Sequence, residues 1–175
     1  MQNQTYGALF ILVLTVIAMS VLQPINLIAN TGNGSQNGEN SIIEIVNYYL
    51  EITEALAADD ARIASVRGQH LQDAINNSVL DHEDWDTQQQ SFIRYTNRIT
   101  GSSNLNTQRI ALNGLTRTMI ETLHSIETNE IELYLQYCSM ALQDGGQWLS
   151  PSEDIANPYY GSSMLACGEN IEIIR

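Results

Sequence analysis

The chain has 175 residues, which is enough for one ordinary domain in addition to a terminal segment. Hydrophobic residues make up 43% of it and charged residues only 15%, so a globular core is expected and disorder outside one short linker is not. The formal net charge is -13, and lysine is absent; because phosphate contacts need clustered cations, nucleic acid is not expected as a partner.

An apolar run from Ala8 to Leu22 dominates the N-terminus. As a helix, its roughly 15 residues would span about 22 Å, the length of a signal-peptide core, and with the weaker apolar tail to Ala29 it would reach across a bilayer. No basic flank precedes the run, and no cysteine directly follows it to accept a lipid. We expect residues 1–29 to be a signal peptide or a membrane anchor, with a core helix as the third alternative. The protein is then periplasmic or otherwise extracytoplasmic, membrane-anchored or secreted.

The stretch "NTGNGSQNGENS", Asn30 to Ser41, has nothing to bury and predicts a flexible linker over residues 30–41. The folded part is therefore expected to occupy residues 42–175, as a helical domain that ends in a Cys/Met motif region.

Four amphipathic helices are predicted next. The first, "SIIEIVNYYLEITEAL", opens with Ser41 and has Glu44 three residues later, which is the capping-box pattern. Asp59 or Asp60 can cap the second, "ARIASVRGQHLQDAINNSV"; the third and fourth lie near "EDWDTQQQSFIRYTNRI" and "NTQRIALNGLTRTMIETLHSI". Each helix has one apolar stripe at helical spacing: Ile42, Ile45, Val46, Tyr49 and Leu56; Ile63, Val66, His70, Ala74 and Ile75; Trp85, Phe92 and Ile99; and Leu112, Leu115, Met119, Leu123 and Ile126. The pattern predicts a mainly α protein, an antiparallel four-helix bundle.

After Glu127 the period changes. "EIELYLQY" alternates, with Leu133, Leu135 and Tyr137 on one side and Gln136 on the other, as in a half-buried strand, and the terminal "NIEIIR" can pair with it. The prediction is a small C-terminal two-stranded β element with a long ordered loop between the strands, and long ordered loops are often functional.

Sulfur-containing residues occur near both ends of that loop: Cys138 with Met140, and Met164 with Cys167. Thiolate and thioether are soft ligands that favour Cu(I), so these four residues could hold one copper ion. The spacing leaves two other interpretations open, a Cys138–Cys167 disulfide with two core methionines, or reduced buried cysteines.

Other chemistry has little support. His70 falls on an apolar face, where a hydrogen-bonded core histidine is the first interpretation and an additional metal ligand the second. His82 is interpreted as a turn residue and His124 as a helix surface residue. No H-E-x-x-H, Gly-rich phosphate loop or Ser/His/Asp spacing occurs, so the protein is not expected to be an enzyme.

The ordered motifs "YCSMA", "WLS", "IANPYYG" and "MLACGE", together with "YYLEITEALAADDA" and "QRIALNGLTRTMI", resemble a domain family of unknown function. This family is found at the C-terminus of some CusB-type periplasmic adaptors of heavy-metal RND efflux pumps and as stand-alone exported proteins. The resemblance covers about Ser41 to the C-terminus. Family members usually read Cys-Pro-Met-Ala, whereas Ser139 stands here in place of the proline, so the turn that presents Cys138 and Met140 is less rigid.

The resemblance implies an envelope setting associated with copper-like metals, but not pump assembly, because the hairpin and barrel domains of an adaptor are absent. The remaining motif residues are interpreted as structural, holding the loop on the helices: Trp148, Asn157, Pro158, Tyr159, Tyr160 and Gly161.

Two hypotheses result. The first is an exported or membrane-tethered domain that binds or passes on a soft metal ion, Cu(I), with copper as its cofactor and an envelope protein such as a metal efflux component as its partner. The alternative is a metal-free, disulfide-stapled structural or protein-interaction module of the cell envelope.

Overall fold

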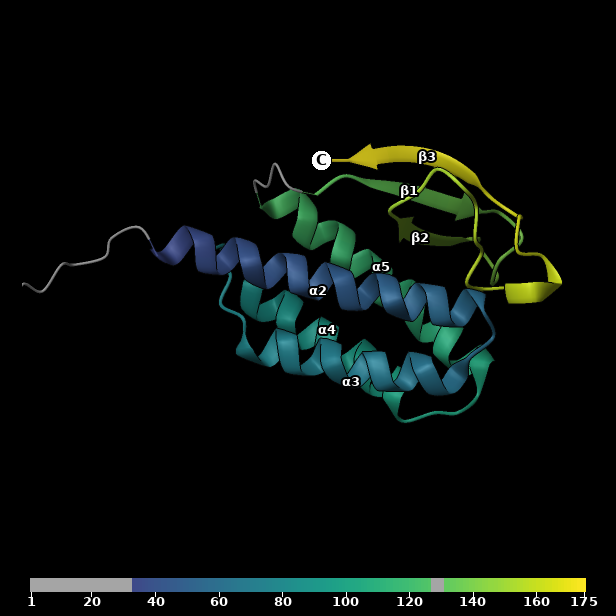
Figure 1. Cartoon of the computed structure of the whole chain (residues 1–175), viewed down its shortest axis with the longest axis horizontal. Helices are drawn as coiled ribbons and strands as arrows, with labels where there is room; N and C mark the ends of the chain where they lie inside the picture. The colour runs from purple at the N-terminus through teal and green to yellow at the C-terminus, as the bar shows by residue number, and fades with distance from the viewer. Residues whose placement is uncertain (1–32, 127–130) are drawn as a thin grey trace, which may run out of the picture. The chain divides into compact units, whose positions relative to one another are not determined.

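The computed structural model describes residues 33–126 and 131–175, in which four helices are followed by a small antiparallel sheet (Figure 1). The elements in chain order are α2 (Asn33–Ala57), α3 (Ala61–Asn77), α4 (Trp85–Thr100), α5 (Leu105–Ser125), β1 (Leu133–Cys138), β2 (Gly146–Ser150), the 3-10 helix η2 (Gly161–Ser163) and β3 (Glu169–Ile174). The signal peptide or anchor predicted over residues 1–29 lies outside the described residues. Within the described ranges, no helix combines the length and the hydropathy that crossing a membrane requires.

Helix α2 begins earlier than the sequence predicts. Residues Asn33 to Ser41 were expected to belong to a flexible linker, but they form the first turns of α2. Gly, Asn and Ser are poor helix formers, yet extending an existing helix costs far less than nucleating one, and the buried Ile42 anchors the helix that they extend. The capping-box prediction is wrong for the same reason, since Ser41 and Glu44 lie inside the helix.

The other helix starts follow the local sequence. Asp60 caps α3, and its Oδ1 accepts a hydrogen bond from the backbone N–H of Ile63 at 2.8 Å. Asn104 caps α5 in the same way, accepting from Thr107 N at 3.0 Å. Each satisfies a backbone donor that the first turn of a helix leaves without a partner. Helix α2 contacts α3 and α5, and α4 contacts α3 and α5, so the four helices enclose one core.

The predicted stripes of α2 and α4 are buried, as are Leu112, Leu115, Met119 and Leu123 of α5. The stripe predicted for α3 is confirmed only at Ala74 and Ile75. Its core side is made by Ala64, Gly68 and Leu71 with Ala74 and Ile75, while His70 is exposed. A Cβ on Gly68 would stand 2.8 Å from the Thr100 side chain, so the small residues allow α3 and α4 to approach closely. A search for large apolar residues does not detect a contact made by small ones.

The sheet has three strands, not two, in the order β2-β1-β3. The predicted pairing of β1 with the C-terminal strand is confirmed, with Leu133 opposite Ile174 and Tyr137 opposite Glu169. Strand β2 was missed, because five residues that include a glycine and two polar side chains do not show a clear alternation. It pairs with β1 so that Leu135 stands opposite Leu149.

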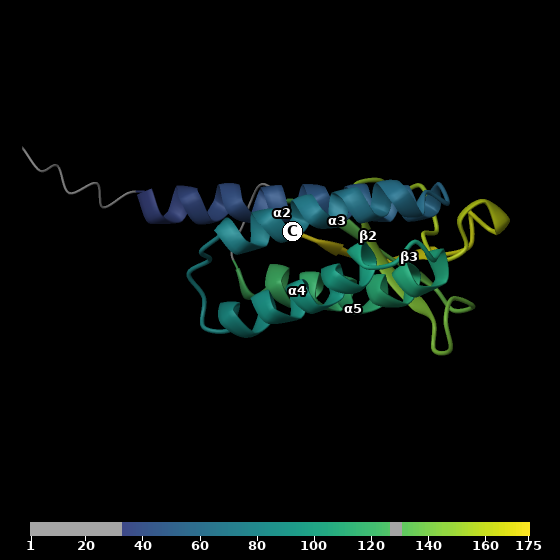
Figure 2. The ribbon, with the colours of Figure 1, turned by 90° about the horizontal axis from the view of Figure 1, so that it is seen from below.

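Both faces of this sheet are covered at β1 and β2, whereas β3 is exposed except at Ile174. One face lies on α2 and α5 (Figures 1 and 2), which contact β2, and the Tyr49 hydroxyl accepts a hydrogen bond from Leu149 N at 3.0 Å. Trp148 points to the opposite face, since neighbouring strand residues alternate, and its ring packs edge-on against Tyr159 at 6.1 Å between centroids. Gln136, which was expected on an exposed face, is fully buried and donates to Ser152 O and to Asn170 Oδ1. The segment after β2 therefore forms a cover over the sheet.

Candidate functional site

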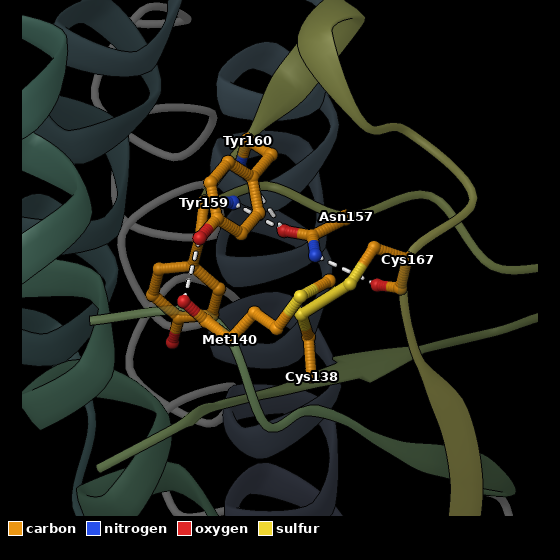
Figure 3. Close-up of a disulfide and its surroundings, with 6 residues drawn as sticks. All are labelled: Cys138, Met140, Asn157, Tyr159, Tyr160 and Cys167. Carbon is orange, nitrogen blue, oxygen red and sulfur yellow. Dashed lines mark hydrogen bonds between the residues drawn. A yellow bond between two sulfur atoms is a disulfide. The ribbon is translucent and has the colours of Figure 1, made fainter. Parts of the chain in front are cut away.

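The candidate site is the segment from Cys138 to Cys167, here called the closed loop because a disulfide joins its ends (Figure 3). Cys138 ends β1 and Cys167 stands just before β3, so the pairing of these strands brings the two cysteines together. Their Cα atoms are 6.0 Å apart, within the usual range for a disulfide. Cys138 is buried and Cys167 is half-buried.

Asn157 holds the middle of the closed loop. It is fully buried, and its side-chain oxygen accepts hydrogen bonds from the backbone N–H groups of Tyr159 at 2.8 Å and Tyr160 at 3.1 Å. Its side-chain nitrogen donates to Cys167 O at 2.7 Å, beside the disulfide (Figure 3). Because a buried amide must satisfy both its donor and its acceptor, Asn157 fixes the "NPYYG" turn relative to the disulfide.

The two tyrosines connect this turn to the β1–β2 hairpin. The Tyr159 hydroxyl donates to Gln147 O on β2, and the Tyr160 hydroxyl donates to Met140 O, each at 2.5 Å. Burial raises the pKa of Tyr159 well above its ordinary value, so this hydroxyl stays protonated and keeps its donor role. The closed loop is therefore fastened to itself at several points besides the disulfide.

An arginine–aspartate pair attaches the closed loop to the helices. Arg109 on α5 donates from Nε to Pro158 O at 2.7 Å. Its Nη2 donates to Leu56 O at 3.0 Å and to Asp59 Oδ1 at 2.6 Å. The other carboxylate oxygen of Asp59 accepts from the N–H and the hydroxyl of Ser162, at 2.9 and 2.6 Å. The Ser162 hydrogen bonds, with the Arg109 guanidinium, lower the pKa of Asp59 to about 2.

Gly161 makes this attachment possible. Its φ of 56° lies in the left-handed region, which glycine adopts without strain. A Cβ at this position would overlap the Asp59 carboxylate and the Arg109 guanidinium. The glycine of the "NPYYG" motif is thus required both by the backbone conformation and by the close approach of an ion pair.

The structure places the four predicted metal ligands in two different environments. Cys138 and Cys167 are bonded to each other, so neither offers a thiolate in this state. Met140 and Met164 lie on the closed loop with 55% and 38% of their surface exposed, instead of in the core where the disulfide interpretation placed them. In Figure 3 the Met140 side chain extends toward the disulfide.

The histidines lie elsewhere in the described structure. His70 is on α3 beside Tyr48, with ring centroids 5.4 Å apart, and it is not the core histidine that its place in the predicted stripe suggested. His82 is in the turn between α3 and α4, and His124 is exposed near the end of α5. Among the described residues, no group of three or more His, Cys, Asp or Glu side chains could hold a metal ion.

Sequence reasoning missed the roles of Asp59, Arg109 and Ser162. Asp59 was considered only as a helix cap, and nothing in its spacing from Arg109 or Ser162 indicates a contact, because these residues come from three separate segments. The sequence signal that could have indicated this contact is the glycine after two tyrosines. It indicates a turn but does not identify the residues that pack against that turn.

The comparisons with known proteins concern the helical part. No curated protein and no solved structure matches the chain. The model of one family, described as "Protein of unknown function (DUF3347)", matches residues 45–130, which run from α2 through α5, while the closed loop lies beyond the match. The helical part of the chain, residues 45–130, is therefore similar to the DUF3347 family.

Proposed function

We propose that the protein is a non-enzymatic, disulfide-stapled interaction module of the cell envelope. The observation that carries this proposal is the closed loop, whose fixed backbone holds large apolar side chains in the solvent. Four such side chains lie on it, each at least 37% exposed: Met140, Leu142, Met164 and Leu165. An apolar surface on a mobile segment would collapse, whereas one held by a disulfide, Asn157 and Arg109 stays available to a partner.

The disulfide also supports the location in the proposal. Structural disulfides persist in oxidising compartments outside the cytoplasm. The N-terminal residues 1–29 are in this proposal the signal peptide or anchor that takes the domain there. The four helices, as an antiparallel bundle, are the platform, and an envelope protein such as a metal efflux component is the partner.

Site-specific photocrosslinking in cells tests the interaction. A photoreactive side chain placed at Met164 should give one discrete adduct with an envelope protein. The matched control is the same group at Val79, which is 79% exposed in the turn between α3 and α4 and does not lie on the closed loop. Identical adducts from both positions, or a protein recovered in the cytosol with two free thiols, would refute the proposal.

A second function is Cu(I) binding by the reduced protein, through Cys138, Met140, Met164 and Cys167. The observation that favours it is the position of Met140, whose side chain extends toward the two cysteine sulfurs (Figure 3). Reduction would convert the disulfide into two thiols beside that thioether, and thiolate with thioether is a donor set that Cu(I) prefers. Binding would then depend on the redox state of the compartment.

Native mass spectrometry and competition with a Cu(I) chelator test this second function. The reduced protein should bind one Cu(I), the oxidised protein none, and Cys138→Ser should abolish binding. Met140→Leu should weaken it, whereas the control Met119→Leu, which changes a fully buried methionine of α5, should not. Equal Cu(I) binding by the oxidised protein or by Cys138→Ser would eliminate the proposed ligand set.

A further inference from the structure

A surface hollow of about 420 Å³ lies between α5 and the turn that joins β1 to β2. We call it the hairpin hollow. Its volume falls within the range of ordinary ligand sites. Helix α5 contributes Asn106, Ile110 and Asn113 to its lining, and the turn contributes Leu142, Gln143 and Asp144.

The turn side of the hollow is conformationally unusual. Leu142 has a φ of 56°, in the left-handed region that a bulky side chain occupies only under backbone strain. Its side chain is nevertheless 37% exposed, facing a hollow instead of filling the core. The neighbouring Gly145 packs under the Tyr137 ring, which fixes the turn. Core packing therefore does not explain why a leucine occupies this strained position.

The polar side chains of the hollow have no partner among the described residues. The side-chain amides of Asn106, Asn113 and Gln143 make no hydrogen bond to any described residue, and the Asp144 carboxylate forms no ion pair with one. Three amides, each able to donate and to accept, match the alternating N–H and C=O groups of an extended backbone. Ile110, which is 44% exposed, and Leu142 form the apolar part of the same lining.

The negative net charge of the protein favours a positively charged partner. The chain carries 20 acidic residues against seven arginines, and three of those arginines are already paired, Arg67 with Glu51, Arg109 with Asp59, and Arg175 with Glu132. A cationic segment is attracted to such a surface, whereas an acidic one is repelled. The carboxylate in the lining of the hollow is that of Asp144.

We propose that the hairpin hollow binds a short extended segment of a partner protein in which an apolar residue is flanked by arginine or lysine. The apolar side chain lies between Ile110 and Leu142, the amides bind the backbone of the segment, and Asp144 pairs with the flanking cation. This inference rests on the proposed function as an interaction module and assigns the surface and the chemistry of the segment.

Selection of a random heptapeptide library on the oxidised protein tests the inference. Enriched peptides should contain an apolar residue next to Arg or Lys. Their affinity should fall at least tenfold on Leu142→Gly, which removes the apolar contact and relieves the left-handed strain, so this variant stays folded. Asp144→Asn should weaken binding two- to fivefold and reduce its salt dependence.

The control variant is Val79→Ser, which changes an exposed apolar residue outside the hollow and should leave affinity unchanged. The inference is overturned if no peptide is enriched, if acidic peptides are enriched, or if enriched peptides bind Leu142→Gly as tightly as the wild type. If one of these results is obtained and the photoreactive group at Met164 still gives a discrete adduct, the proposed interaction module is supported. Only the hairpin hollow is then excluded as its binding surface.

Discussion

Reducing the Cys138–Cys167 disulfide should lower the stability of the domain by a calculable amount. The two cysteines are 29 residues apart. In the chain-entropy model, closing a loop of this length removes about 12 cal/mol/K from the unfolded chain, which is about 3.6 kcal/mol at about 25 °C. For a domain of this size the corresponding decrease in melting temperature is about 10 °C. The helices should stay folded, because Asn157 and Arg109 also hold the closed loop.

Urea unfolding followed by circular dichroism measures this effect on the oxidised and the reduced protein, a comparison in which no side chain is replaced. The reduced protein should also show a larger dependence on urea, since its unfolded chain exposes more surface. The double variant Cys138→Ala/Cys167→Ala provides the check without reductant. A stability change under about 1 kcal/mol, or loss of the helical signal before urea is added, would refute the staple as described.

Three further changes test the contacts that hold the closed loop. Asp59→Asn keeps the backbone conformation but loses the charge, and should cost about 1–2 kcal/mol at neutral pH. Because folding lowers the pKa of Asp59 from 3.8 to about 2, the contribution of its charge to stability is present above about pH 4 and is lost between pH 4 and 2. The stabilities of the wild type and the variant should therefore converge as the pH falls through that window. A stability difference independent of pH would contradict the ion pair. Tyr49→Phe leaves the buried N–H of Leu149 without its acceptor and should cost about 1–3 kcal/mol in urea unfolding, whereas unchanged stability would mean that another acceptor replaces the hydroxyl. Gly161→Ala should destabilise by at least about 2 kcal/mol in thermal unfolding, and a neutral result would show that the turn relaxes away from Asp59.

Several predictions that rest on a repeated local pattern were confirmed. The stripes of α2 and α4 are buried, Asp60 caps α3, and the strand at Leu133 pairs with the C-terminal strand. Each follows from a regular period of side chains or from one residue that bonds to its own neighbours. The failures occurred where packing overrides local preference: at the start of α2, at the small residues of α3, and at the short strand β2.

By itself, the sequence determined that the protein is mainly helical, that its polypeptide is strongly acidic, and that two cysteines and two methionines lie near the two ends of one loop. Only the tertiary structure decided how those sulfurs are used, pairing the two cysteines and leaving both methionines exposed. Only it brought Asp59, Arg109 and Ser162 together, from segments 50 and 103 residues apart along the chain. The physical reason is that the periodicity of a helix or a strand depends on residues close together in the sequence. A contact between distant segments depends instead on how whole helices and strands pack.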